Sequence, residues 1–347
     1  MPQAWARWIA QRASITRFGI PNAAPGPAGR FAFTIYVRIV CREQYTEKLL
    51  MVAQNVPTFS VIVATHNRPQ ALVRCLRALA GSDLARSDFE VIVVNDGSSV
   101  DYEESLSKIR REFDFQYLTQ KQGGPALARN TGLAIARGRY VAFTDDDCAP
   151  APTWLSALKS CLALHPEAAV GGKTVNGLPA NSYSEAHEML MTYIAEYQKR
   201  NLPGWSPFLA GNNFALSREQ FVETGAFDQA WRYAAAEDRE FFSRWLARGK
   251  EVVQTDEAVN HHFHAMTFSS FLEVHSRYGS GARLLHRGSG RTGERLVRSG
   301  PFLFYWNLIF FPFGRCSMTR AAKYSALLAL AQAAHAFGYF RQIVAGS

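Results

Sequence analysis

Apolar and polar positions alternate in blocks between residues 58 and 150. Short runs rich in β-branched residues, which predict buried strands, occur at 59–65, 90–94, 115–118 and 139–144. The intervening segments carry apolar residues at helical spacing, which predicts helices at 69–80, 101–111 and 126–137. This alternation of strand and helix predicts a parallel sheet flanked by helices, so the expected fold class is α/β.

Beyond residue 150 the pattern is mixed. Strand-like runs occur at 168–175, 208–216 and 251–254. Helical patterns occur at 153–164, 183–199, just after Ser217, at 237–249 and at 269–286. An almost wholly apolar run at 301–313 and an Ala/Leu-rich helical pattern at 319–340 then predict an apolar helical extension at the C-terminus.

Polar side chains stand where the predicted parallel strands end. They are Thr65, Asn67, Asp96, Asp145 and Asp147. Because parallel strands end along one rim of the sheet, where open α/β sheets bind ligands, we expect these side chains to lie together. Asp145, Asp146 and Asp147 are consecutive and repel one another, so a hard divalent cation such as Mg²⁺ or Mn²⁺ would neutralise them. The alternative is a solvated acidic turn or a helix N-cap.

The net charge of +9 is unevenly distributed. Residues 1–42 contain six Arg and no acid, residues 277–347 contain nine Arg and one Lys against Glu294, and residues 43–276 therefore carry −6. The basic ends favour binding to an anionic membrane surface. The sequence contains no zinc-finger, homeodomain or RNA-recognition signature that would suggest binding to nucleic acid. None of the five cysteines forms a CxxC pair, which favours a reducing, cytoplasmic location.

The pattern divides the chain into three parts. Residues 1–57 form a poorly defined extension without assigned function, with a Pro/Gly/Ala linker at 21–29; the alternative is that translation begins at Met51. Residues 58–285 hold the α/β pattern, and residues 286–347 form the basic, apolar tail. The absence of GxGxxG after the first strand and of GxxxxGK[ST] argues against a dinucleotide-binding domain and a P-loop ATPase.

A set of short motifs follows in order along residues 58–285. They are Thr65-His66-Asn67-Arg68, Val94-Asn95-Asp96-Gly97-Ser98, Gly123-Gly124-Pro125-Ala126, Ala128-Arg129-Asn130, Asp145-Asp146-Asp147, Gly225-Ala226-Phe227-Asp228 and Glu237-Asp238. Together they resemble the family-two inverting glycosyltransferases of GT-A fold, in the nucleotide-diphospho-sugar transferase superfamily. The resemblance implies a Rossmann-like, mostly parallel sheet. It also implies transfer of a hexose-type sugar from a nucleotide-diphosphate donor, most commonly a UDP-sugar, to an acceptor hydroxyl.

The resemblance also implies donor-binding roles for seven residues. They are Thr65, Asn67, Arg68, Asp96, Arg129, Asp145 and Asp146. Asp96 would accept a hydrogen bond from the nucleobase, Thr65 and Arg68 would shape that pocket, and Arg129 would lie near the nucleotide. The alternatives are that Asp96 and Gly123-Gly124 only form turns.

A divalent metal, Mn²⁺ or Mg²⁺, is implied at Asp145 and Asp147. It would bridge the two phosphates and stabilise the leaving nucleotide diphosphate, while Asp146 would face the sugar or be structural. Among His261, His262 and His264, we expect His262 to be the third ligand, since imidazole suits Mn²⁺ better than Mg²⁺. The alternative is three loop histidines that bind no metal.

Glu237-Asp238 resembles the family's pair in which the aspartate is the general base. Asp238 would take the proton of the acceptor hydroxyl, and Glu237 would orient the acceptor or Asp238. A single displacement of this kind inverts the anomeric centre. The alternative is an acid pair that the helix dipole favours at a helix N-terminus.

From the basic, apolar tail at 286–347, we expect the protein to attach peripherally to the cytoplasmic face of a membrane. The 13 residues of 301–313 are too few to span a bilayer as a helix, which takes about 20. The alternatives are a further helical layer and a dimer contact. The donor sugar stays open, as does the acceptor, which could be a glycan, a lipid-linked glycan or a small molecule.

Two other functions compete with sugar transfer. A non-catalytic sugar-nucleotide or membrane-binding module would tolerate loss of the base, yet Asp238 and the carboxylate triplet are present. A nucleotidyltransferase would need a Gly-rich basic loop after the first strand, where this chain offers only Arg68.

Overall fold

The computed structural model describes residues 56–201, 209–230, 236–288 and 302–344. The chain separates into two units, residues 1–55 and 56–347, and all described residues belong to the second. The linker expected at 21–29 and the alternative start at Met51 therefore lie outside the described residues.

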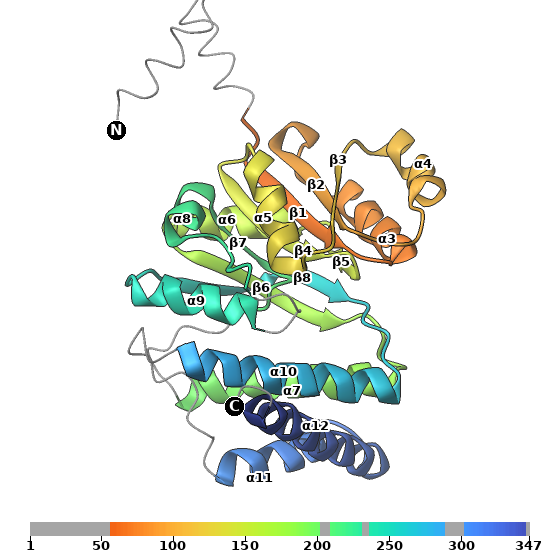
Figure 1. Ribbon diagram of the computed structural model, residues 1–347, viewed down its shortest axis with the longest axis vertical. Coiled ribbons are helices and arrows are strands. Elements are labelled where there is room, and N and C mark those ends of the chain that lie inside the picture. Colours follow the sequence, from red (N-terminus) through yellow and green to blue (C-terminus); the bar gives the residue numbers. More distant parts are fainter. Residues whose placement is uncertain (1–55, 202–208, 231–235, 289–301, 345–347) are drawn as a thin grey trace, which may run out of the picture. The chain divides into compact units, whose positions relative to one another are not determined.

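A mixed sheet of eight strands runs through the described part of the chain (Figure 1). The strands are β1 Phe59–Thr65, β2 Phe89–Asp96, β3 Gln116–Gln120, β4 Tyr140–Asp145, β5 Cys148–Pro150, β6 Ala169–Asn176, β7 Phe214–Ser217 and β8 Val252–His262. Their order is β3-β2-β1-β4-β7-β6-β8-β5. Strands β1 to β4 pair in parallel, as do β6 and β8, whereas β7 pairs antiparallel with β4 and β6, and β5 with β8.

Helices cover the sheet and extend beyond it. They are α3 Pro69–Ala80, α4 Glu103–Glu112, α5 Pro125–Ile135, α6 Trp154–Leu164, α7 Ser182–Asn201, α8 Arg218–Thr224, α9 Glu237–Ala247, α10 Phe268–Gly288, α11 Phe302–Phe310 and α12 Met318–Val344. Two 3₁₀ segments are η1 Arg86–Asp88 and η3 Phe311–Gly314. The α/β fold with helices around the sheet and a helical C-terminal extension confirms the predicted fold class.

Strand β1 shows why the apolar runs become central strands. Successive side chains of a strand point to opposite faces, so a run that is apolar throughout suits a strand covered on both sides. Val61 and Val63 join the apolar cluster formed with α3, α4 and α6, whereas Ile62 joins the cluster formed with α5, α8 and α9. The β-branched run 61–63 thus anchors both helical layers.

Helices α7, α10, α11 and α12 lie together (Figure 1), and their apolar side chains form a separate cluster. Helices α10 and α12 approach so closely that a Cβ atom added at Gly279 would lie 1.9 Å from the His335 carbonyl oxygen, and one at Gly338 would lie 1.8 Å from that of Ser276. Glycine is therefore required at this crossing. Across the described ranges, no helix combines the length and apolar character needed to cross a membrane.

The sequence pattern missed one strand and misjudged the bounds of two others. Strand β5 was not expected, and the apolar run at 301–313 forms helix α11 followed by η3. The strand expected at 251–254 extends to His262 because β8 pairs with β6 at both of its ends and also pairs with β5 over residues 260–262. The strand expected at 208–216 is shorter, since β7 begins at Phe214.

Candidate active site

Three predicted site residues stand at the carboxyl ends of parallel strands. Thr65 ends β1, Asp96 ends β2 and Asp145 ends β4. The register places Thr65 opposite Asn95 and Ala64 opposite Asp145, so these strand ends meet at one edge of the sheet. The structure thus brings the predicted rim together.

The middle carboxylate of the triplet faces the protein. Asp146 is fully buried, accepts a hydrogen bond from Thr65 Oγ1 at 2.7 Å and forms an ion pair with Arg68 Nη2 at 2.7 Å. Burial raises the pKa of Asp146 to about 7, although the charge of Arg68 opposes the rise. The side chain that was predicted to face the sugar or be structural therefore binds Thr65 and Arg68 in this structure.

Asp147 lies between an arginine and a histidine. Its Oδ2 accepts a hydrogen bond from Arg68 Nη1 at 2.6 Å, and its Oδ1 lies 3.4 Å from His262 Nε2. Burial opposes the charge of Asp147, but the close approach and charge of His262, together with the charge of Arg68, hold its pKa well below the usual range. Of the two buried carboxylates, Asp146 and Asp147, Asp147 is therefore the one that ionises more readily.

Arg129 connects the triplet to the acid pair at the start of α9. Its guanidinium is 5% exposed and donates to Asp145 Oδ1 and to Glu237 Oε1, each at 2.8 Å. Residues 145 and 237 are far apart in sequence. The Arg129 guanidinium nevertheless holds the carboxylate triplet and the Glu237-Asp238 pair side by side. Arg129 was predicted near the nucleotide, and the structure places it between these two carboxylates.

Asp238 lies beside the same arginine. Its Oδ2 accepts a hydrogen bond from the Gly211 amide at 3.0 Å, and its Oδ1 accepts one from the Arg239 amide at 2.8 Å. A Cβ atom added at Gly211 would lie 3.2 Å from Asp238 Oδ2 and 3.5 Å from Arg129 Nη2, which shows how closely these groups converge. Burial, followed by the charge of Glu237, raises the pKa of Asp238 to about 6.

Asp96 organises the loop before α5. Its Oδ1 accepts hydrogen bonds from Gln120 Nε2 and the Gly123 amide, and its Oδ2 accepts one from the Gly124 amide. The predicted turn role is therefore visible in the structure, while Asp96 Oδ2, which accepts one hydrogen bond, has a second lone pair for a ligand. Asn67, with a φ of 55°, accepts hydrogen bonds from the Ser99 and Val100 amides and so ties its loop to the one after β2.

The donor set around Asp147 fits a divalent cation. Among the described residues, Asp147 Oδ1 is buried and has only His262 Nε2 near it, at 3.4 Å and outside hydrogen-bond geometry, which leaves an anionic oxygen for a ligand. Ligand atoms of Asp147, Cys148 and His262 lie within 4.8 Å of one another. Asp145, predicted as a second carboxylate ligand, is outside this group and is held by Arg129.

Sequence reasoning missed two residues of this site. Tyr102 receives a hydrogen bond from the Arg68 amide at 2.8 Å, and its hydroxyl lies 2.9 Å from Thr65 Oγ1, but nothing in the α4 pattern marks it. Cys148 pairs with His262 across β5 and β8. The only sequence signal for Cys148 was its position after the carboxylate triplet.

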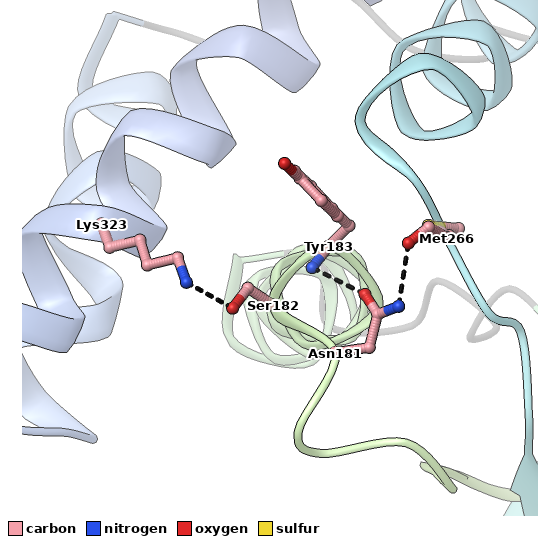
Figure 2. Close-up of a pocket in the computed structure, with 5 residues that line it drawn as sticks. All are labelled: Asn181, Ser182, Tyr183, Met266 and Lys323. Carbon is pink, nitrogen blue, oxygen red and sulfur yellow. Dashed lines mark hydrogen bonds between the residues drawn. The ribbon is translucent and has the colours of Figure 1, made fainter.

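A cavity of about 260 Å³ lies elsewhere, between the start of α7 and α12 (Figure 2). Its lining consists of Asn181, Ser182, Tyr183, Met266 and Lys323. Asn181 caps α7 through the Tyr183 amide and donates to the Met266 carbonyl oxygen, as Figure 2 shows. None of the predicted site residues lines this cavity, so it is separate from the carboxylate site.

The fold resembles that of a solved glycosyltransferase. The mannosyltransferase PcManGT from Pyrobaculum calidifontis superposes with a TM-score of 0.57 at 17% sequence identity, over 80% of this chain and 87% of that one. At this identity the likeness establishes the fold alone. The strand-end carboxylates therefore lie on a fold of GT-A type.

Sequence comparison gives the family. A family model described as "Glycosyl transferase family 2" matches residues 60–225. Chondroitin synthase from Escherichia coli is 26% identical over 58% of this chain and 34% of its own length, and hyaluronan synthase from Pasteurella multocida is 27% identical over 58% and 24%. The chain thus spans about a third or less of the length of these relatives. The family model covers just under half of the chain and supports the glycosyltransferase family expected from the motifs.

Proposed function

We propose that the chain moves a sugar from a nucleotide-diphosphate donor to an acceptor hydroxyl, with inversion at the anomeric carbon. The observation that carries the proposal is the Arg129 bridge between Asp145 and Glu237, with Asp238 beside it. A transferase of this type needs the diphosphate and the base on opposite sides of one sugar. The bridge holds the predicted diphosphate side and the predicted acceptor side next to each other.

The donor is assigned to the rim at the ends of β1, β2 and β4. Asp96 offers the remaining lone pair of its Oδ2 to a nucleobase imide, and Thr65, Asn67 and Arg68 shape the neighbouring loops. We propose a UDP-sugar as the donor. Because PcManGT is described in complex with GDP-Man and Mn²⁺, guanosine donors belong in the same panel.

A divalent metal fits Asp147 and His262, and Asp145 is the proposed carboxylate toward the ribose. When bound, such an ion would offset the negative charge that develops on the leaving nucleotide diphosphate. Arg68 already neutralises Asp146 and Asp147, so donor binding requires Arg68 to share these carboxylates with the ion or to turn toward the phosphates. Mn²⁺ suits a site with an imidazole ligand better than Mg²⁺ does.

Asp238 is the proposed general base. With its pKa at about 6, its carboxylate is ionised near neutral pH and can take the proton of an acceptor hydroxyl as the new bond forms. Glu237, held by Arg129, keeps the start of α9 in place so that Asp238 faces the sugar. The two relatives above are named as synthases of chondroitin and hyaluronan, and we propose a glycan acceptor presented at a membrane surface.

The test compares nucleotide-diphosphate release by the parent chain and by Asp238→Asn, with Mn²⁺ and a panel of donors. We expect the variant to lose at least about 100-fold in kcat, the lower range for removing a positioned general base. Glu219→Gln, an exposed acid in the first turn of α8, is the matched control and should keep full activity. Donor binding without any turnover by the parent chain would instead support a non-catalytic sugar-nucleotide module.

A further inference from the structure

A continuous row of aromatic rings lies exposed on α11 and η3. Phe302, Trp306, Phe310 and Phe313 are 79%, 53%, 47% and 36% exposed. The first three are spaced four residues apart, which places them on one face of the helix. Neighbouring ring centroids along the row are 6.1, 4.8 and 5.8 Å apart, so the rings form one surface, here called the aromatic stripe.

The opposite face of α11 fixes the stripe to the rest of the molecule. Leu308 is fully buried in the apolar cluster of α7, α10 and α12, and Phe304 packs against the same cluster. Tyr193 of α7 donates a hydrogen bond to the Phe304 carbonyl oxygen at 2.7 Å, and its ring lies 5.1 Å from that of Phe304. The stripe is therefore the outer face of a helix whose inner face already has its partners.

The charged residues within the segment that carries the stripe have one sign. Residues 302–344 contain Arg315, Arg320, Lys323 and Arg341 and no acid. Two of these cations have protein partners, since Arg315 pairs with Glu196 and Lys323 donates to Ser182 Oγ (Figure 2). Arg320 is exposed at the start of α12, a few residues beyond the stripe.

We propose that the aromatic stripe docks on the surface of an anionic lipid bilayer. Aromatic side chains favour the level of the lipid headgroups, and nearby basic residues attract anionic lipid. Helix α11 has nine residues and is therefore about 14 Å long, far short of the roughly 30 Å of a hydrocarbon core, so it would lie in the interface. The absence of acids from 302–344 favours an anionic surface over a basic partner.

Vesicle flotation of the full chain tests the proposal. We expect the parent chain to float with phosphatidylcholine vesicles that contain phosphatidylglycerol, and much less with phosphatidylcholine alone. Trp306→Ser/Phe310→Ser should reduce the bound fraction at least tenfold, because two rings of the stripe are lost. Leu164→Ser, which removes a 79% exposed apolar side chain from the end of α6, is the matched control and should bind like the parent.

Two further measurements separate lipid docking from a loss of folding in the variant. Arg320→Glu should weaken binding to anionic vesicles and leave any residual binding to neutral vesicles unchanged. Thermal unfolding of the doubly substituted variant should match the parent, because both side chains are exposed. Vesicle binding needs no turnover, so it can fail or succeed independently of the proposed sugar transfer.

Vesicle binding that survives Trp306→Ser/Phe310→Ser would overturn the proposal. So would a parent chain that ignores vesicles but forms a dimer in size-exclusion chromatography that this variant abolishes. In that case the stripe would be a contact between two copies of the chain.

Discussion

The substitution Arg129→Met removes the one cation that joins the two predicted acidic sites. Arg129 is 5% exposed and lies 2.8 Å from both Asp145 and Glu237. Methionine keeps the length and apolar stem of the side chain but leaves the Glu237 carboxylate, only 7% exposed, without its cation. Removing one partner of a buried ion pair costs about 3–5 kcal/mol. Because Asp145 is 30% exposed and can regain water, we expect the lower end, about 3 kcal/mol.

Urea unfolding of the full chain measures this cost, and thermal unfolding should show a fall of about 6 °C at roughly 2 °C per kcal/mol. The matched control is Lys159→Met, which removes a half-exposed pair with Asp88 and should cost less than about 1 kcal/mol. Arg129→Met/Glu237→Gln should recover part of the loss, because the unpaired buried charge is gone. A loss for Arg129→Met no larger than that for Lys159→Met would refute the reasoning.

Three further predictions concern pH, metal binding and helix packing. Burial raises the pKa of Asp238 to about 6 and a base acts only when ionised, so kcat/KM should fall as the pH drops through about 6 and level off above it. A flat profile for the parent chain in this range would contradict the role of Asp238. His262→Gln should weaken Mn²⁺ binding by at least about tenfold in calorimetric titration, whereas the exposed His165→Gln should leave it unchanged. Gly338→Ala should lower the free energy of unfolding by about 1–3 kcal/mol, because its Cβ would meet the Ser276 carbonyl oxygen; Gly314→Ala, with nothing within 4 Å, should be neutral. Equal stability of these two glycine variants would show that α10 and α12 do not cross in contact.

The local pattern of apolar residues was sufficient to predict the strands and helices that build the rim of strand-end side chains. The run 59–65 is apolar and β-branched, and as a central strand it is buried on both faces, so periodicity and environment agree. The helix expected at 69–80 has the predicted bounds because Pro69 can open it and apolar residues recur on one face. The strand-end residues Thr65, Asp96 and Asp145 followed from these elements and the rule for parallel strands.

The features that could not be predicted from the sequence depend on contacts between residues that are far apart along the chain. Strand β5 has three residues, too few for a periodic signal, and it exists because Cys148 and its neighbours pair with the end of β8. The Arg129 bridge depends on bringing positions 129, 145 and 237 together, which no local spacing encodes. The run 301–313 was visibly apolar, but only the structure shows which of its rings pack against the cluster of α7, α10 and α12 and which form the exposed stripe.

The most direct test of sugar transfer at the carboxylate rim is a donor screen that measures nucleotide-diphosphate release by the full chain, with Mn²⁺ or with EDTA. We predict release from at least one nucleotide-diphosphate sugar, lost with EDTA and lost in Asp147→Asn. Absence of release from every donor, or release that Asp147→Asn leaves unchanged, would contradict sugar transfer at this rim.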